Sequence, residues 1–476
     1  MLVLLVALLT TYSPLASTRA DAAPSAVGLG RLDGEGRVQG EAVQPRRAAR
    51  LTAGSHGARS ALERPEWAIL FYLGHGGNLD AEAQAVFEAL AAADRRPGVD
   101  VYVLWDRSDP DTRDALYRIG GQTDPSRYTL GSDMWLPAEL GLPDELDMGG
   151  EDTLVKFVNW VLTENPSHVM LVLWNHGLGF APTAETGMGA TIEGICWDDD
   201  DSYLTSKELR AAFRRFGKPI DVLHLNACLM QMLEVLWQIG DGTDQEHGAR
   251  YVVSAEDLTW SVSTRPSWEA RLLSAVGSST TPSGLARLVA ATYHESLVAE
   301  GQYHTVSVVD LGQLPGVMAS FASFADALRA ALPEHRPAIE SSRAATQKFD
   351  ENADLTISED DAYIDLWHFA HGVSHAVLGV DPAAVHLRQS ARRLMRGVRG
   401  MVKYNEYLSD GPRRSFSTGA HGEASTNGIS IYFPRSSEHS HYGNYQNTSA
   451  TPADLELVAE THWDEFLNDL FAQGSP

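Results

Sequence analysis

The chain has little cysteine and little positive charge. Only two of its 476 residues are cysteines, Cys196 and Cys228, which excludes a disulfide-dense framework. The 37 Lys and Arg residues are outnumbered by 63 Asp and Glu residues, so the formal net charge is -26. This charge disfavours nucleic acid and anionic membrane surfaces as partners. Beyond the first residues, no apolar run is long enough to span a bilayer.

The amino terminus has the pattern of an export signal. Leu2–Leu9 is apolar but too short to cross a membrane, and small residues for a signal peptidase follow at Ala20-Asp21-Ala22. No basic residue precedes the apolar stretch, so an uncleaved anchor or a mis-chosen start codon stays an alternative. Residues 23–64 are rich in Gly, Ala, Arg and Pro without apolar periodicity. We expect a signal peptide at residues 1–22, a flexible leader or pro-segment at 23–64, and a secreted or extracytoplasmic protein that leaves the membrane after cleavage.

Strand and helix patterns alternate from Trp67 onward. Four nearly continuous apolar runs are typical of strands that are buried on both faces of a parallel sheet: Trp67–Leu73, Val99–Trp105, His168–Trp174 and Ile220–Leu225. Helical periodicity lies between them, as at Leu79–Leu90. This alternation predicts an α/β fold with a mainly parallel sheet flanked by helices.

The pattern changes beyond Gly312. Alanine-rich stretches at Val317–Leu332 and Pro382–Val398 predict helices, and Asn427–Phe433 predicts a late strand. We therefore expect a catalytic α/β domain at residues 65–311 and an additional C-terminal helical lobe with a late strand at residues 312–476.

Two of the buried runs each end in a reactive side chain. His176 follows one run and Cys228 follows another, and ligands of a parallel sheet gather beyond the carboxyl ends of its strands. A nearby imidazole, and the first amides of a helix predicted over Leu229–Ile239, would favour the thiolate of Cys228. The backbone N–H groups of Gly177 and Cys228 are candidates for an oxyanion hole. The pattern predicts nucleophilic catalysis, whereas a disulfide between Cys196 and Cys228 would remove the thiolate.

Four consecutive aspartates, Asp198 to Asp201, precede a predicted helix at Ser206–Phe216. The helix is indicated by the capping-box spacing of Thr205 and Glu208, and its dipole favours negative charge near its start. The run lacks the spacing of an EF-hand calcium loop. We expect no cofactor, with calcium as the alternative and Asp198 and Asp200 as its ligands.

Several segments resemble the clostripain family of cysteine peptidases, in the caspase-like clan. The resemblance rests on Trp174-Asn175-His176-Gly177, Cys196-Trp197-Asp198 and Asn226-Ala227-Cys228-Leu229-Met230. It implies a caspase–haemoglobinase fold and a dyad in which Cys228 is the nucleophile and His176 is the general base and acid. It also implies an endopeptidase that forms a thioacyl-enzyme intermediate and cleaves proteins or peptides after Arg or Lys.

Three positions depart from the family pattern. Asn226 stands where relatives carry an Asp that attracts a basic side chain, and Glu256 or Asp257 is the candidate replacement. Relatives often mature by cutting themselves between the His and the Cys, but the loop 177–206 contains no Lys or Arg, so cleavage after a basic residue is not expected in that loop. The turn that contains His75 lacks the Asp that relatives carry before the Asn, and His75 is a rival to His176 as the catalytic imidazole.

Three functions fit these residues. The first is a secreted cysteine endopeptidase whose preference for a basic residue before the cleaved bond is weakened by Asn226. The second is a clostripain-like binding or surface module that has lost efficient catalysis. The third is a metal-dependent hydrolase built on the aspartate run, whose activity would survive Cys228→Ala.

Overall fold

The computed structural model describes residues 64–75, 79–108, 113–181, 183–185, 191–198, 202–240, 248–409, 416, 426–445 and 455–472. The predicted signal peptide, almost all of the predicted leader and Asp200 lie outside the described residues. The chain divides into two compact units, and all the described residues fall within the unit Ala61–Pro476.

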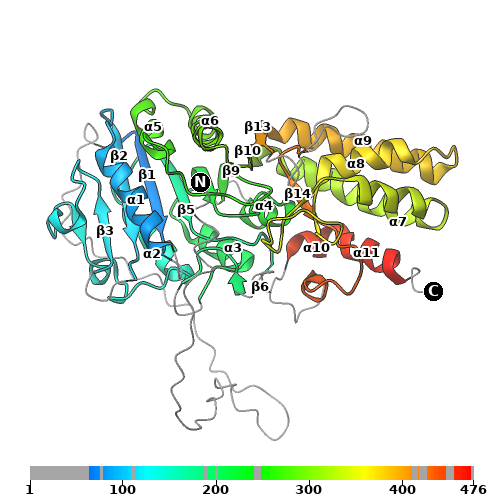
Figure 1. Cartoon of the computed structure of the whole chain (residues 1–476), viewed down its shortest axis with the longest axis horizontal. Coiled ribbons are helices and arrows are strands. Elements are labelled where there is room, and N and C mark those ends of the chain that lie inside the picture. Colours follow the sequence, from blue (N-terminus) through cyan, green and yellow to red (C-terminus); the bar gives the residue numbers. More distant parts are fainter. Residues whose placement is uncertain are drawn as a thin grey trace, which may run out of the picture. The chain divides into compact units, whose positions relative to one another are not determined.

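A central sheet organises this unit (Figure 1). Among the described residues it has nine strands, which are, in order across the sheet, β13 (Val402–Leu408), β10 (His304–Asp310), β9 (Ala249–Ser254), β8 (Ile220–Asn226), β5 (His168–Trp174), β1 (Trp67–Leu73), β2 (Val99–Trp105), β3 (Ala115–Arg118) and β4 (Met134–Trp135). The strands from β9 to β2 run parallel. The flanking strands β13, β10, β3 and β4 pair antiparallel. The predicted mainly parallel sheet is confirmed.

Both faces of the sheet are buried, which explains the continuous apolar runs. In β1, Ala68, Leu70 and Tyr72 belong to one hydrophobic core, whereas Ile69 and Phe71 belong to the other. This alternation follows from the two-residue period of a strand. The helices before residue 312 that contribute to the first core are α2 (Glu151–Leu162), α3 (Ser206–Arg215) and α4 (Leu233–Ile239), and helices beyond residue 312 contribute to it as well. The helices that contribute to the second core are α1 (Asp80–Ala92), α5 (Trp268–Ala275) and α6 (Pro282–Glu300).

The amino ends of α3 and α4 show how local sequence and tertiary contacts compete. At α3 the predicted capping box forms, because Thr205 Oγ1 accepts from Glu208 N–H and Glu208 accepts from Thr205 N–H. The helix predicted from Leu229 instead begins at Leu233. Leu229 has a φ of 64°, and its N–H donates to Asp257 O, so the chain leaves Cys228 in a turn. The expected helix directly after Cys228 is therefore wrong.

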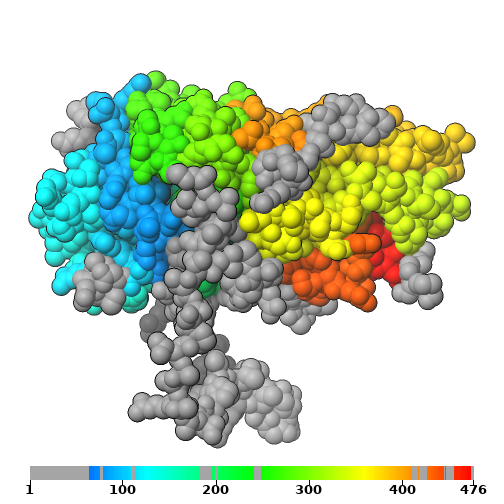
Figure 2. All heavy atoms as spheres, in the orientation of Figure 1, coloured from blue at the N-terminus to red at the C-terminus, as the bar shows by residue number. Residues whose placement is uncertain are grey.

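The chain beyond residue 312 is mainly helical, as predicted. Its helices are α7 (Leu314–Ala345), α8 (Leu366–Ala376), α9 (Pro382–Met401), α10 (Glu456–Thr461) and α11 (Trp463–Ala472). α7, α8 and α9 pack on one another, and they lie together in Figures 1 and 2 (lime to orange). The late strand is β14 (Ser430–Tyr432), which joins β11 (Lys348–Phe349) and β12 (Tyr363–Asp365) in a small sheet. β13 also lies beyond residue 312, but it pairs with β10 in the central sheet. The domain boundary at residue 312 stays a prediction.

Two further short strands, β6 (Thr183–Glu185) and β7 (Thr191–Glu193), form a hairpin in the segment between β5 and α3. Within the described part of the chain, every helix is too short or too polar to cross a bilayer.

Candidate active site

The neighbouring strands β5 and β8 end side by side at the carboxyl edge of the sheet. They are parallel, and their last matched pair is Trp174 with Asn226. His176 and Cys228 each follow two residues after this pair. Adjacent strands lie about 4.8 Å apart, so the register brings the two turns that carry these residues together.

Gly177 packs against the backbone that carries Cys228. A Cβ atom at Gly177 would lie 2.8 Å from Cys228 O and 2.9 Å from the Cβ of Ala227. Only a glycine fits so close an approach. A side chain at Gly177 would therefore crowd the turn that follows β8.

His176 is held by its neighbour Asn175. The N–H of His176 donates to Asn175 Oδ1 at 2.5 Å, and the Asn175 amide donates to Trp197 O at 3.0 Å. The rings of His176 and Trp197 lie 6.3 Å apart, between centroids. Burial lowers the pKa of His176 to about 4, because an apolar environment disfavours the imidazolium. Near neutral pH the ring is therefore uncharged and can accept a proton.

Cys228 is a free thiol in contact with Thr259. The N–H of Thr259 donates to Cys228 Sγ at 3.3 Å, and Thr259 Oγ1 lies 3.5 Å from the sulfur. Cys196 is also free and is buried, so the alternative of a disulfide between the two cysteines is wrong. The helix begins only at Leu233, and the backbone N–H that the structure places on the thiol is that of Thr259.

Three residues were predicted to select the substrate side chain. Asn226 ends β8 and is buried beside the turn that carries Cys228. Glu256 and Asp257 are buried as well, at 1% and 0% exposure. Asp257 is close to the same turn through its backbone, since its carbonyl accepts from Leu229 N–H at 3.1 Å.

The side chains of Glu256 and Asp257 have different surroundings. Glu256 accepts from Gly428 N–H at 3.0 Å and forms a side-chain hydrogen bond with Asp365. Burial and the neighbouring carboxylate of Asp365 raise the pKa of Glu256 well above its usual value. Burial and Asp365 thus favour the protonated form of Glu256, which can donate to Asp365. Asp257 Oδ1 accepts from Asp350 N–H at 3.2 Å.

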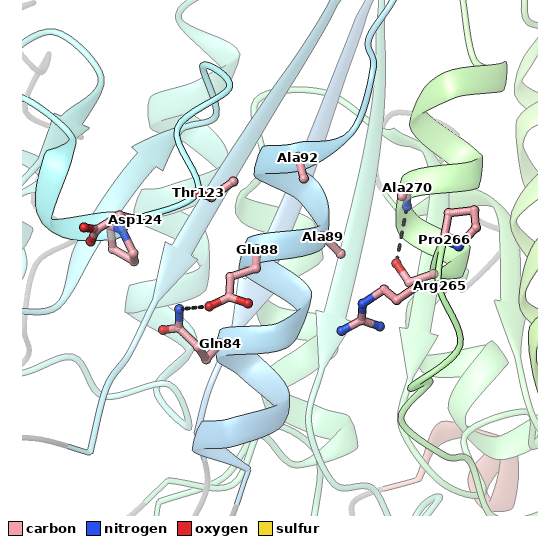
Figure 3. Close-up of a pocket in the computed structure, with 11 residues that line it drawn as sticks. Gln84, Glu88, Ala89, Ala92, Thr123, Asp124, Arg265, Pro266 and Ala270 are labelled. Carbon is pink, nitrogen blue, oxygen red and sulfur yellow. Dashed lines mark hydrogen bonds between the residues drawn. The ribbon is translucent and has the colours of Figure 1, made fainter.

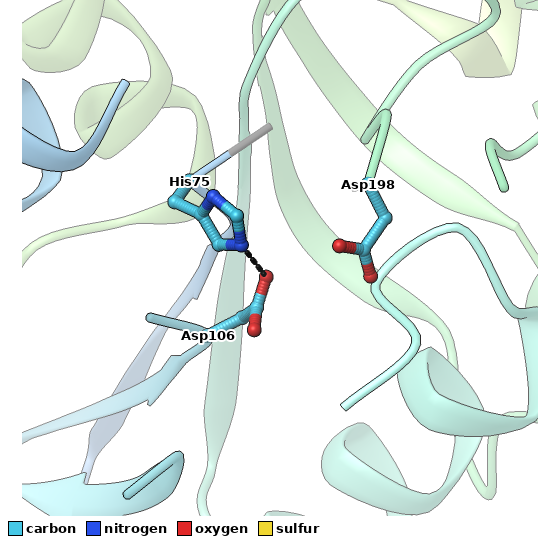
Figure 4. Close-up of side chains that lie close together, drawn as sticks. All are labelled: His75, Asp106 and Asp198. Carbon is cyan, nitrogen blue, oxygen red and sulfur yellow. Dashed lines mark ion pairs between the residues drawn. The ribbon is translucent and has the colours of Figure 1, made fainter. Parts of the chain in front are cut away.

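The aspartate run is represented by Asp198, since Asp200 lies outside the described residues. Asp198 is buried, and it approaches two side chains that follow β1 and β2, namely His75 and Asp106 (Figure 4). His75 Nε2 lies 3.3 Å from Asp106 Oδ2. The structure thus groups Asp198 with residues that are distant in the sequence, and His75 belongs to this group.

A separate pocket of about 720 Å³ lies between α1 and the start of α5 (Figure 3). Its polar lining includes Glu88, Asp124 and Arg265. Gln84 donates to Glu88 at 2.7 Å on the α1 side. None of the residues expected in the active site lines it, so this pocket carries no part of the candidate chemistry.

The sequence missed the contact of Thr259 with Cys228 and the grouping of Asp106 with Asp198. Thr259 follows β9 in an irregular loop, and no motif marks it. Asp106 could have been found from the sequence, because it directly follows a buried strand. It therefore lies at the edge of the sheet where ligands gather.

Comparisons with known proteins bear on the family and the fold. The model of the clostripain family matches residues 83–470. A solved structure of a secreted C11 cysteine protease from Bacteroides thetaiotaomicron, in complex with an irreversible peptide inhibitor, has 15% identity and a TM-score of 0.54; the match covers 84% of this chain and 100% of that chain. A secreted C11 cysteine protease from the same organism, called iotapain, has 13% identity and a TM-score of 0.53, with coverage of 85% and 99%. A search of curated proteins found no match. The likeness to the solved structures shows a shared caspase-like fold.

Proposed function

This chain belongs to the clostripain family of cysteine peptidases, and from that premise we propose that Cys228 is its nucleophile and His176 its general base and acid. The observation that carries the proposal is the register of β5 and β8, which sets both residues two positions beyond the last matched pair. The contact of Gly177 with Cys228 O supports it, because the two turns touch.

The reaction follows from the uncharged state of His176. The imidazole accepts the thiol proton as Cys228 Sγ attacks the peptide carbonyl carbon, and the N–H groups of Gly177 and Cys228 stabilise the resulting oxyanion. His176 then returns the proton to the leaving amine, which leaves a thioacyl-enzyme. Water, deprotonated by His176, attacks this intermediate and releases the acid product and the thiol. These steps use side chains and water and involve no cofactor.

We propose a preference for a basic residue before the cleaved bond, weakened by Asn226. An amide can accept from a guanidinium but adds no charge. Of the two candidate carboxylates, Asp257 suits the role better than Glu256, because burial and Asp365 favour the protonated form of Glu256. Cleavage of substrates with Arg or Lys should therefore weaken in Asp257→Asn more than in Glu256→Gln.

The natural setting is proposed to be outside the cytoplasm. The apolar stretch at the amino terminus supports export, and the two Bacteroides structures are described as secreted proteases. The proposed substrates are proteins or peptides, and the acidic charge disfavours nucleic acid. The leader at residues 23–64 is proposed to be removed or to stay flexible beside a catalytic domain at 65–311 and a C-terminal lobe at 312–476.

Profiling of the purified protein against a peptide library tests the proposal. We expect cleavage that disappears in Cys228→Ala and in His176→Ala, and fast alkylation of Cys228 by iodoacetamide below pH 7. Cys196 is buried and serves as the internal control thiol, since it should react slowly in the same protein. Cleavage that persists in Cys228→Ala would contradict the dyad and favour the metal-dependent hydrolase.

The second candidate function is a binding or surface module with impaired catalysis. Asn226 and the burial of Glu256 and Asp257 favour it, because the two carboxylates that would attract a basic substrate side chain are at 1% and 0% exposure. Absence of cleavage by the mature protein, together with slow alkylation of Cys228, would support this function over the peptidase.

A further inference from the structure

Three buried side chains from distant parts of the chain converge beyond β1 and β2: His75, Asp106 and Asp198 (Figure 4). Each offers a ligand atom, and these atoms all lie within 4.8 Å of one another. His75 Nε2 is 3.3 Å from Asp106 Oδ2, and Figure 4 shows the Asp198 carboxylate facing this pair. We propose that these three side chains bind one divalent transition-metal ion, Zn²⁺ or Mn²⁺.

The carboxylate of Asp198 is oriented toward the group by backbone contacts. Asp198 Oδ2 accepts from Met148 N–H at 2.6 Å, and the N–H of Asp198 donates to Ser202 O at 2.9 Å. Met148 is fixed in turn, because its carbonyl accepts from Tyr72 OH at 2.9 Å. Support of this kind, behind the ligands themselves, is what orients the side chains of metal sites.

The charge of the group favours a cation. Asp106 and Asp198 are 0% and 4% exposed, and His75 contributes at most one positive charge to balance them. Two more acidic residues, Asp114 and Glu145, approach Asp106 within 4.8 Å.

The residue after Asp106 is basic, and its side chain lies against an aromatic ring. The guanidinium of Arg107 lies over the ring of Trp105, at 4.4 Å from its centroid. Buried carboxylates are found where they are paired or bind a cation, and a divalent ion would balance the two carboxylates of the group.

The ligand atoms favour a transition metal over calcium. Zn²⁺ binds imidazole nitrogen and carboxylate oxygen at about 2.1 Å, so two ligand atoms of a tetrahedral site lie roughly 3.4 Å apart. The 3.3 Å between His75 Nε2 and Asp106 Oδ2 matches this spacing. Calcium takes about six to eight oxygen ligands, whereas this group includes an imidazole.

A metal ion at this site would stabilise segments that lie next to the proposed dyad. The Asn175 amide donates to Gly74 O at 3.3 Å and to Trp197 O at 3.0 Å. Gly74 precedes His75 and Trp197 precedes Asp198, so an ion held by His75 and Asp198 would fasten the two segments that Asn175 joins. Asn175 also holds His176. This consequence rests on the proposed function, whereas metal binding itself does not.

A second histidine with two acidic neighbours provides a matched control. His168 Nδ1 lies 3.0 Å from Asp221 Oδ1, and its Nε2 lies 4.0 Å from Glu66 Oε1. The two carboxylates thus approach opposite ring nitrogens and cannot share one ion with the ring. Asp221→Asn removes a His–carboxylate pair of similar kind without changing the proposed site.

The experiment uses the full chain carrying Cys228→Ala, so that the nucleophile is neither a metal ligand nor able to cleave the protein. The protein is stripped with EDTA, dialysed against Zn²⁺, Mn²⁺ or Ca²⁺ separately, and assayed for bound metal and for Tm. We expect about one Zn²⁺ or Mn²⁺ per chain and a Tm rise of roughly 3–5 °C at a hundredfold excess over Kd. Asp106→Asn and His75→Gln should bind at least tenfold more weakly, and Asp221→Asn should bind like the parent.

Equal binding by the parent and both site variants would overturn the site, as would a Tm rise with Ca²⁺ alone. If Asp106→Asn does not fold, Asp198→Asn takes its place. Metal binding equal to that of the parent would then overturn the site, and binding at least tenfold weaker would support it. Both readouts are independent of peptide cleavage, so loss of the proposed function would leave the metal result standing. Conversely, an active enzyme that binds no Zn²⁺ or Mn²⁺ would refute only the metal site.

Discussion

The carboxyl edge of the central sheet carries two pairs of parallel strands that end in register. β5 and β8 end together, and an imidazole and a thiol follow at His176 and Cys228. β1 and β2 also end together, and an imidazole and a carboxylate follow at His75 and Asp106. One pair has the groups for proton transfer and nucleophilic attack, the other the groups for binding a cation.

In both pairs the sheet places an imidazole close to a second side chain. The identity of this second side chain, a thiol or a carboxylate, determines which chemistry the pair can perform. A thiol can donate a proton to an uncharged ring, whereas two carboxylates beside a ring form an anionic ligand set. Asn175 links the two ends, since its amide contacts the carbonyls of Gly74 and Trp197. Changes at the second pair should therefore reach the first only indirectly.

The largest expected contrast is between the two histidines. His176→Ala should lower kcat/KM by about 10²–10⁴-fold, because it removes the general base. His75→Ala should lower it by less than about tenfold, because His75 acts only through the support of His176. Hydrolysis of the best library peptide measures both. Equal losses would mean that the two ends are one catalytic unit, or that His75 is the true base.

The two glycines that follow these strands should also differ. Gly177→Ala sets a Cβ 2.8 Å from the rigid carbonyl of Cys228, and we expect a loss of activity of up to about 100-fold with about 1–3 kcal/mol of destabilisation. Gly74→Ala meets the end of the Asn175 side chain at 2.9 Å, which can rotate. Gly74→Ala should therefore reduce activity and stability less than Gly177→Ala does. A reduction larger than that of Gly177→Ala would show that the Asn175 side chain cannot move.

Acid should act on the catalytic end through His176. Its pKa is about 4 in the folded chain and about 6.5 in the unfolded chain, so the unfolded chain binds more protons between these values. The stability that the fold gains from the uncharged form of His176 is fully present above pH 6.5 and is lost as the pH falls toward 4. The free energy of unfolding, measured with urea, should fall between pH 7 and pH 4 in both proteins. Because the ring is half-buried, we expect the fall in His176→Gln to be about 1–2 kcal/mol smaller than the fall in the parent.

Other groups titrate in the opposite direction over the same range. Burial raises the pKa of Asp365 to about 7 and that of Glu234 to about 7, so each stabilises the fold below pH 4 and ceases to do so as the pH rises through 7. These contributions are common to the parent and His176→Gln and cancel in the difference. Identical pH profiles for the two proteins would contradict the lowered pKa of His176.

The smallest effect is expected at Thr259. Thr259→Val removes the hydroxyl near Cys228 Sγ and keeps the backbone donor, so alkylation below pH 7 should slow by about two- to tenfold. Thr259→Ser keeps the hydroxyl and should react like the parent. If both variants react alike, the hydroxyl does not act on the thiol.

Much of the fold could be predicted because burial on both faces leaves a continuous apolar run. The predicted bounds of β1, β2 and β5 agree with the structure to the residue. The helix predicted at Val317–Leu332 is part of the longer α7, which continues through Pro333 and Pro337. Between the two prolines, Arg336 donates to the carbonyls of Asp469 and Leu470 in α11, a tertiary contact that local propensity cannot reveal.

The sequence by itself determined the alternation of strands and helices, the two reactive residues at strand ends, and the family. Periodicity and short motifs are local, and they record which face of each element is buried. Only the tertiary structure decided that Leu229 turns toward Asp257 instead of starting a helix, that Glu256 pairs with Asp365, and that His75, Asp106 and Asp198 meet. The physical reason is that these contacts depend on strand order and register, which bring together residues that no local pattern connects.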